Sequence, residues 1–272
     1  MTTHVAVARR GGVTLIAFAM GTAALLMFGG SASAAIVPTV NLATSANYSV
    51  LGASGVTNTG PSTLGASLGV SPGTSVTGFP PGKVLAPGTT DKTNAAAAQA
   101  QSDLTAAYVN AAGRSINATT KADLANLTLK AGVYAGPSHG ALGLTGPLVL
   151  DGAGDSNAVF IFQTNSTLIT GSSSTVTLIN GAEACHVFWQ VGSSATLGTG
   201  STFTGNILAL TSISVKTSVT VHGRALARKG AVTLDNDTFT QPTCAASSSS
   251  TTTTVPSASP ATPVAGTPKF TG

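Results

Sequence analysis

Two acidic residues in the segment LDGAGDSN, Asp151 and Asp155, have the type and spacing of a possible carboxylate pair. Enzymes that cleave glycosidic bonds use two carboxylates, one of which donates a proton. However, Asp in such a glycine-rich turn commonly accepts hydrogen bonds from its own backbone. Glu183 has no obvious second acid, and neither a nucleophile–base pattern nor a phosphate-binding loop is recognisable. We therefore predict that the protein is not an enzyme and uses no cofactor.

The first residues have the pattern of a secretory signal peptide. Arg9 and Arg10 precede an apolar run over residues 13–28, and Ala32-Ser33-Ala34 provides a small-x-small cleavage site. The alternative is a membrane anchor, for which the apolar run is short. We predict cleavage after Ala34, so that residues 1–34 are removed and the protein is secreted or displayed at the cell surface.

Export makes a disulfide between Cys185 and Cys244 the expected state of the two cysteines. The alternative is a metal site built on Cys185 and His186, but further ligands at useful spacing are missing. The other histidines with possible roles are scattered, and His222 and Arg224 are expected to be solvated at a corner of the fold. No metal site is predicted.

Composition points to a β-rich domain with an uncharged surface. Only 7% of the residues are charged, glycine is abundant, and aromatic residues are few. This pattern is typical of many short strands joined by tight turns. Without Arg9 and Arg10 the chain is nearly neutral, and only Arg224, Arg228 and Lys229 lie close together in the remaining sequence. Nucleic acid is therefore not an expected partner, and we expect a monomer.

One helix is predicted, at about residues 94–112. Leu104, Ala107, Tyr108 and Ala111 form one apolar stripe at helical spacing. Thr93 or Asn94 can cap the start, and Gly113 is placed where a left-handed C-terminal residue is common.

The segment from about residue 127 to residue 240 contains a repeat. Units of similar length begin at Val187, Ile207 and Ala225, and a longer unit begins at Ala158. Each unit holds three short strand-like pieces, which predicts a β-solenoid of triangular section. The first piece of each unit is apolar at consecutive positions, as in a strand buried on both faces. We place the helix against these strands and Trp189 in the core or against the helix.

The end of the chain has a different composition. Residues 245–272 are rich in Ser, Thr and Pro, and we predict a disordered tail. The terminal PKFTG loosely resembles a wall-sorting signal, so the cell wall is a possible partner through this tail. The folded domain is thus expected to span residues 35–244.

Several long segments resemble the microbial ice-binding-protein-like family. They are LGVSPGTSVTGFPPG, AVFIFQ, LINGAEACHVFWQVGSSATLGT, FTGNILALTSISV and GRALARKGAVTLDNDTFT. The resemblance implies a discontinuous right-handed β-solenoid with a long helix packed alongside. It also implies a secreted protein that adsorbs to ice, in antifreeze or ice-recrystallisation inhibition roles.

Members of that family often repeat a T-A/G-x-T/N motif on one solenoid face. Thr199-Gly200-Ser201-Thr202 matches the motif, and Thr217-Ser218-Val219-Thr220 matches it with Ser at the second position. We align Thr170–Ser173, Asn236–Phe239 and Thr59–Ser62 as weaker copies. The predicted ice-contacting residues are Thr59, Thr170, Ser173, Thr199, Ser201, Thr202, Thr217, Thr220 and Asn236.

A flat solenoid face also suits ice on physical grounds. Strands repeat at about 4.7–4.9 Å, and alternate residues repeat at about twice 3.3 Å. Threonine is stiff at χ1, so its methyl and hydroxyl groups are held in place. Because the motif drifts at Ser173, Ser218 and Asp237, we expect moderate activity. Two alternatives remain open: the threonines are ordinary strand residues, or the domain is an adhesin or structural module without strong ice activity.

Overall fold

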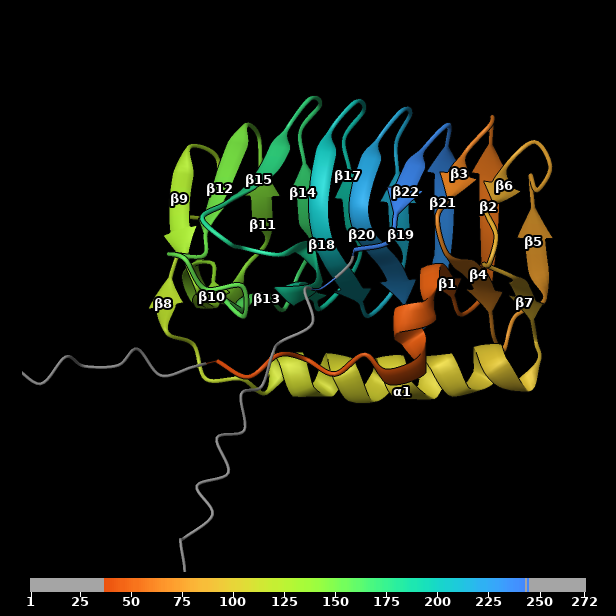
Figure 1. Ribbon diagram of the computed structural model, residues 1–272, viewed down its shortest axis with the longest axis horizontal. Helices are drawn as coiled ribbons and strands as arrows, with labels where there is room; N and C mark the ends of the chain where they lie inside the picture. Colours follow the sequence, from red (N-terminus) through yellow and green to blue (C-terminus); the bar gives the residue numbers. More distant parts are fainter. Residues whose placement is uncertain (1–36, 243, 245–272) are drawn as a thin grey trace, which may run out of the picture. The chain divides into compact units, whose positions relative to one another are not determined.

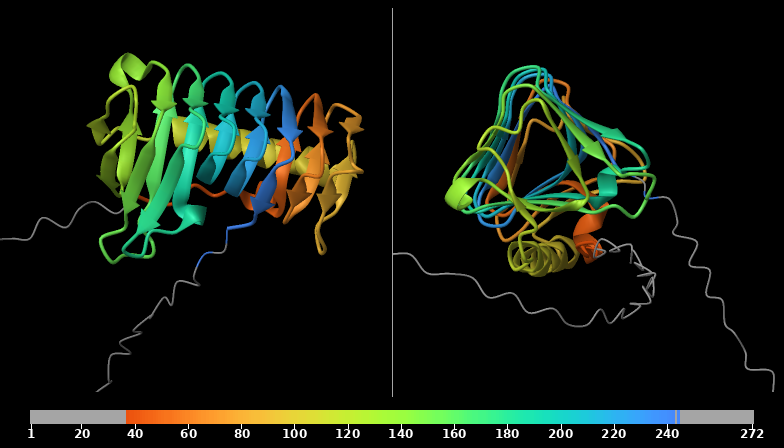
Figure 2. Two further views of the ribbon diagram at one scale, coloured as in Figure 1. Left: turned by 90° about the horizontal axis from the view of Figure 1, so that it is seen from above. Right: turned by 90° about the vertical axis from the view of Figure 1, so that its left-hand side faces the viewer.

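The structure, a computed structural model, describes residues 37–242 and 244. In these residues the chain winds into a solenoid whose coils each contribute one strand to three faces (Figures 1 and 2). We name them the helix face, the middle face and the third face. All strand pairs between coils are parallel, and the end-on view in Figure 2 shows the triangular section. The predicted signal peptide and the tail lie outside the described residues.

The helix face and the third face belong to one large sheet because β18 and β20 each run through both. In spatial order the helix face contains β8 (Ala118–Thr119), β10 (Gly132–Ala135), β13 (Phe160–Thr164), β16 (Val187–Val191), the second halves of β18 (Thr202–Ala209) and β20 (Thr220–Ala227), β1 (Tyr48–Gly52), β4 (Ser67–Val70) and β7 (Thr90–Lys92). The third face contains β9 (Leu127–Lys130), β12 (Pro147–Asp151), β15 (Thr175–Ile179), the first halves of β18 and β20, β22 (Thr238–Thr240), β3 (Thr63–Leu64) and β6 (Lys83–Val84).

The middle face is a separate seven-stranded sheet. Its order is β11 (Leu142–Leu144), β14 (Leu168–Thr170), β17 (Ala195–Leu197), β19 (Ile213–Val215), β21 (Ala231–Asp235), β2 (Gly55–Thr59) and β5 (Ser75–Thr77). The N-terminal strands thus stack directly after the C-terminal strands, which Figure 1 shows as orange beside blue. The solenoid is discontinuous, as the resemblance implied.

The helix α1 (Ala95–Ala112) returns the chain along the solenoid from the β7 end toward β8 (Figure 1). Asn94 caps its start, because the side-chain oxygen accepts from the Ala97 amide at 2.9 Å. Gly113 has a φ of −83°, so the predicted left-handed C-terminal residue is wrong. Its amide instead continues the helical pattern by donating to the Val109 carbonyl at 3.0 Å. Three short 3-10 helices complete the elements: η1 (Ala43–Asn47), η2 (Pro137–His139) and η3 (Ala184–His186).

Alternation along the helix-face strands builds two cores. Phe160 and Phe162 point into the solenoid, whereas Ile161 points outward into the layer that α1 covers. Leu104 of α1 is fully buried in that outer layer, and burying such a side chain stabilises the fold by about 1.5–3 kcal/mol. The predicted placement of the helix is therefore confirmed.

Trp189 lies at the centre of the inner core. Its ring stacks on Phe162 with centroids 4.1 Å apart, and its indole N–H donates to the Thr204 carbonyl at 3.0 Å. The alternative of a sugar-stacking platform is excluded by this burial. No helix among the described residues is long and apolar enough to cross a membrane.

Register corrects one detail of the predicted repeat. Trp189 pairs with Ile207, and Ile207 pairs with Ala225, so Val187 is not the equivalent of Ile207. Arg224 is also not solvated as expected. Its side chain is 5% exposed, since it lies under the segment that contains Ala46. His222 is exposed on the third face.

Candidate functional site

The corner between the middle face and the third face carries the predicted motif. Thr202 pairs with Thr175 in one neighbouring coil and with Thr220 in the other. Counting back from these pairs, Thr199–Thr202 corresponds to Ser172–Thr175 and not to Thr170–Ser173. Thr220 pairs with Thr238, so the next copy is Asp235–Thr238. Two of the three weaker copies, Thr170–Ser173 and Asn236–Phe239, were therefore assigned out of register, whereas Thr59 pairs with Asp235.

The second position of five of these corner turns has a positive φ. The values lie between 57° and 80° at Ser173, Gly200, Ser218, Asn236 and Gly60. This left-handed conformation favours glycine and tolerates short polar residues, whereas larger side chains are strained. A small residue at this position of the motif is therefore a backbone requirement. Ser173 and Ser218 differ from the motif in residue type, but they are short polar residues that also adopt the left-handed conformation.

The third position points inward. Ser201 is 1% exposed and donates to the Gly198 carbonyl at 2.7 Å. Thr170 is 3% exposed, and its hydroxyl accepts from the Gly198 amide at 2.9 Å. Both side chains serve the turn from inside, so the prediction that they contact a surface ligand is wrong. The other predicted residues reach the surface, with Thr202 and Thr220 partly exposed; the exposed ones are Thr59, Ser173, Thr199, Thr217 and Asn236.

The structure brings five threonines into one row at the start of the third face. Each residue of this third-face row pairs with the next across adjacent coils, in the order Thr175, Thr202, Thr220, Thr238 and Thr63. Adjacent parallel strands lie about 4.7–4.9 Å apart, so the hydroxyl and methyl groups repeat at that spacing. Only Thr202 and Thr220 of this row were predicted, because the register error hid the others.

The middle face carries a second row that the sequence analysis missed. It consists of outward residues in consecutive strands, paired in the order Thr196, Ser214, Thr233, Thr57 and Thr77. Each has apolar neighbours in its strand that point into the core, as in VTL and GVT. That period-two alternation was the available signal. The row continues past Thr196 to Ile169, which is 53% exposed, and then to Gly143.

On the side of this row away from the corner, the described residues of the middle face include no charged side chains. The residues two positions earlier in each strand or turn are small and uncharged: Thr167, Ser194, Ser212, Ala231, Gly55 and Ser75. These two rows lack the long, strongly hydrated side chains that disorder nearby water. The arrangement thus presents a rigid grid of methyl and hydroxyl groups.

Charged residues lie at the corner between the middle face and the third face. Asp235 lies where the other corner turns have Thr or Ser, and it accepts a hydrogen bond from the Thr217 hydroxyl. Asp237, at the inward third position, accepts from the Val219 and Asp235 amides at 2.9 and 2.8 Å. Burial raises the pKa of Asp237 to about 6. Lys216 is exposed beside this corner, and Asp235 is the last residue of β21, so charged groups lie along the corner edge of the middle face.

The candidate carboxylate pair has a structural role instead. Asp151 accepts from the Ala153 amide and from the Asn180 side chain, both at 2.8 Å. The Ala153 hydrogen bond is the main cause that lowers the pKa of Asp151. Asp155 accepts from the Asn157 amide at 2.8 Å. Each carboxylate therefore closes its own turn.

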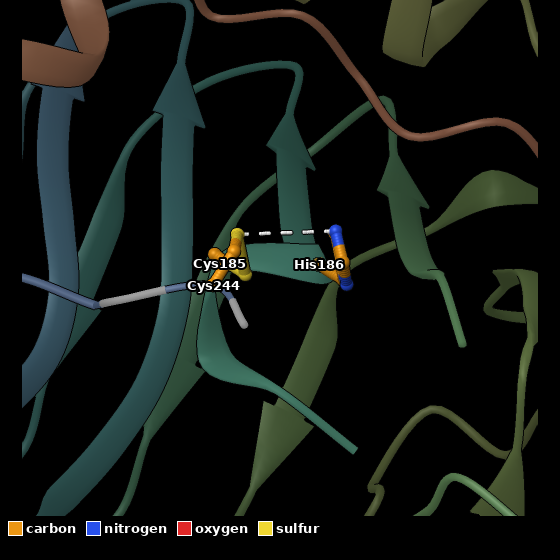
Figure 3. Close-up of side chains that lie close together, drawn as sticks. All are labelled: Cys185, His186 and Cys244. Carbon is orange, nitrogen blue, oxygen red and sulfur yellow. Dashed lines mark hydrogen bonds between the residues drawn. A yellow bond between two sulfur atoms is a disulfide. The ribbon is translucent and has the colours of Figure 1, made fainter. Parts of the chain in front are cut away.

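The predicted disulfide between Cys185 and Cys244 is present (Figure 3). His186 lies next to it, with Nε2 3.9 Å from the Cys244 sulfur. These three residues are close enough to suggest a metal site, but both sulfurs are bonded to each other. A disulfide sulfur is not a thiolate ligand, so the cluster offers a metal ion only an imidazole.

Parallel coils, a flanking helix and a flat face of hydroxyl rows define a β-solenoid binding protein whose ligand is an extended surface. The sequence matches the ice-binding-like family over residues 50–240. The chain belongs to this family, and its function is therefore binding rather than catalysis.

Individual relatives agree with this assignment. The chain is 51% identical over 208 residues to an ice-binding protein of Nostoc sp. (strain HG1), covering 74% of this chain and 76% of that protein. It is 36% identical to an ice-binding protein of Flavobacterium frigoris (strain PS1), covering 78% and 80%. The crystal structure of an ice-binding protein from the Antarctic ascomycete Antarctomyces psychrotrophicus superimposes with a TM-score of 0.72 at 40% identity, covering 75% of this chain and 99% of that one.

Proposed function

We propose that the protein binds ice through the middle face and the adjoining corner. The observation that carries the proposal is the middle-face row, in which Thr196, Ser214, Thr233, Thr57 and Thr77 follow one another in five consecutive strands. The third-face row extends the hydroxyl array around the corner. Family membership and the names of the relatives support the same ligand.

The energetics of such a surface depend on many weak contacts. A net hydrogen bond contributes only about 0.5–1.5 kcal/mol, so no single threonine holds the protein on a crystal. The strands fix the backbone, and β-branching restricts χ1, so little ordering remains when the face meets a lattice. Simultaneous contact of both rows then gives strong adsorption.

A direct test compares a middle-face variant with a matched control in an ice-recrystallisation assay. Thr233→Tyr places a bulky ring in the middle-face row. Thr128→Tyr makes the same change at an exposed strand position on the third face, outside both rows. We expect grain growth to resume with Thr233→Tyr and to stay inhibited with Thr128→Tyr. Grain growth with the unmodified protein equal to that of buffer contradicts the proposal.

We also propose that the protein acts outside the cell as a monomer. Its predicted signal peptide and its disulfide support export, because such bonds persist in oxidising compartments. Size-exclusion chromatography with light scattering tests the monomer, and fractionation of the producing cells tests the location. Attachment to a cell wall through residues 245–272 stays a prediction for the same fractionation.

A further inference from the structure

Arg224 is a buried cation without an acidic partner. Its side chain is 5% exposed, whereas the guanidinium group is always charged near neutral pH. All eight Asp and Glu residues of the chain lie within the described part. Burial alone lowers the pKa of Arg224, to about 10, and no nearby carboxylate opposes this shift. A buried charge normally has a counter-charge, because its desolvation is costly otherwise.

Only some of the N–H donors of the Arg224 guanidinium group have an acceptor, and these acceptors are neutral oxygens. Nε donates to the Ala46 carbonyl at 2.8 Å, and Nη1 donates to the Asn206 side-chain oxygen at 2.7 Å. Asn206 is itself fixed, since its amide nitrogen donates to the carbonyls of Cys185 and Val187. No protein acceptor for Nη2 occurs among the described residues. Arg224 is therefore held rigidly while part of its five-donor fork stays available.

Arg224 lines a pocket of about 290 Å³. The pocket lies where the segment Thr39–Ala46 passes the disulfide, and its other walls include His186, Pro242 and Cys244. No acidic side chain of the described residues lines it. Glu183 approaches the disulfide, with Oε2 3.7 Å from the Cys185 sulfur, but it is not part of the pocket wall.

We propose that this pocket binds a small oxyanion, such as a carboxylate, sulfate or phosphate group, through the guanidinium group of Arg224. A planar guanidinium with two free N–H groups matches the geometry of such ligands. The bound anion supplies the missing counter-charge and joins Arg224 to the crossing segment. Its effect is on stability, because the site lies at the corner between the third face and the helix face, away from the middle face.

The test is thermal unfolding of the full mature chain in sodium sulfate and, separately, sodium acetate, at constant ionic strength. We expect a saturable rise in Tm of about 2–4 °C. Arg224→Gln should abolish the saturable rise, and Arg228→Gln should retain it. Arg228 is the matched control because it is a partly exposed arginine that stacks on Tyr108, 4.5 Å from the ring centroid. A rise that is equal in both variants overturns the proposal.

A second measurement does not depend on whether Arg224→Gln folds. Crystals of the unmodified chain soaked in sodium selenate, an oxyanion of the shape of sulfate, should give an anomalous selenium peak with an oxygen within hydrogen-bond distance of Nη2 of Arg224. No peak there overturns the proposal. A peak without the saturable rise in Tm means an adventitious ion only, which also overturns it. Neither result bears on ice binding, which is assayed separately.

Discussion

Thr57 and Thr233 lie directly opposite each other in the parallel pair β2–β21, and both side chains face outward on the middle face. One comes from the start of the folded chain and the other from its end. The pair joins two halves of one surface, since Ser214 follows Thr233 on one side and Thr77 follows Thr57 on the other. The ice-binding surface we propose therefore depends on the N-terminal coils as much as on the C-terminal repeat.

We predict that Thr57→Tyr and Thr233→Tyr weaken inhibition of ice recrystallisation to a similar extent. Each ring lifts the face away from a flat crystal at the centre of the middle-face row. A loss of about 1.4 kcal/mol in adsorption corresponds to a tenfold higher concentration for the same inhibition. The double variant should be less than additive, because one ring already breaks the contact.

Thr128→Tyr is the control for both variants, as an exposed strand threonine outside the two rows. Circular dichroism and the unfolding midpoint must match the unmodified protein. Loss of inhibition with Thr233→Tyr alone would assign the surface to the C-terminal repeat and contradict the joined surface.

Much of the fold follows from the sequence because burial imposes simple periodicity. Residues such as Phe160 and Ile161 are apolar in succession because one faces the core and the next faces α1. The stripe that contains Leu104 defines the helix face in the same way. The discontinuous order of the coils, in contrast, was predicted only from the family resemblance. Leu51 pairs with Leu226, and nothing in the local sequence of either segment indicates this contact.

The site was less predictable because its register is set by turns rather than by apolar residues. Thr170-Gly171 resembles the motif in letters, yet Thr170 is the last residue of a middle-face strand. Ser173 fits the motif poorly in letters, yet it occupies the left-handed position that Gly200 occupies in the next coil. Letters alone do not distinguish a residue chosen for its φ angle from one chosen for its surface.

Two glycines of the same region should respond differently to alanine. Gly200 has a φ of 67°, but the nearest atom to an added Cβ is Ser173 Oγ at 3.8 Å. Gly200→Ala should therefore lower the free energy of unfolding by about 1 kcal/mol through backbone strain alone. Gly205 has a φ of 114°, and an added Cβ would lie 2.7 Å from Val187 Cγ1 and 2.8 Å from Trp189 Nε1.

Gly205→Ala should accordingly cost more than about 3 kcal/mol, since strain and overpacking combine. Urea unfolding of both variants measures the difference. Equal losses would contradict the close contact around Trp189.

Asp237 should give the domain a measurable pH dependence. Its pKa is raised from 3.8 to about 6 in the folded state, so the folded chain binds a proton more tightly than the unfolded chain. The contribution of this group to the free energy of unfolding therefore falls as pH rises from about 4 to about 6. Asp237→Asn cannot ionise and should lack this slope.

The measurement is urea unfolding of both proteins at several pH values, with Asp155→Asn as an exposed-turn control. The difference between the unmodified protein and Asp237→Asn should change by about 1–2 kcal/mol across the interval, after allowance for solvent screening. Other carboxylates cancel in this difference. A flat difference between pH 4 and pH 6 would show that Asp237 is not buried as described.

Removal of the disulfide should separate stability from ice binding. Cys185 and Cys244 are 59 residues apart in sequence, and their bond ties the C-terminal end to the start of β16. Replacing both with Ala should lower the free energy of unfolding by about 2–4 kcal/mol, because the unfolded chain gains freedom. Inhibition of ice recrystallisation near 0 °C should persist, since neither cysteine lies in a strand of the middle face. The unmodified protein in a reducing agent serves as the matched comparison.

If the variant keeps its unfolding midpoint but loses inhibition of ice recrystallisation, the region around the disulfide belongs to the ice-contacting surface, and the assignment to the middle face is wrong.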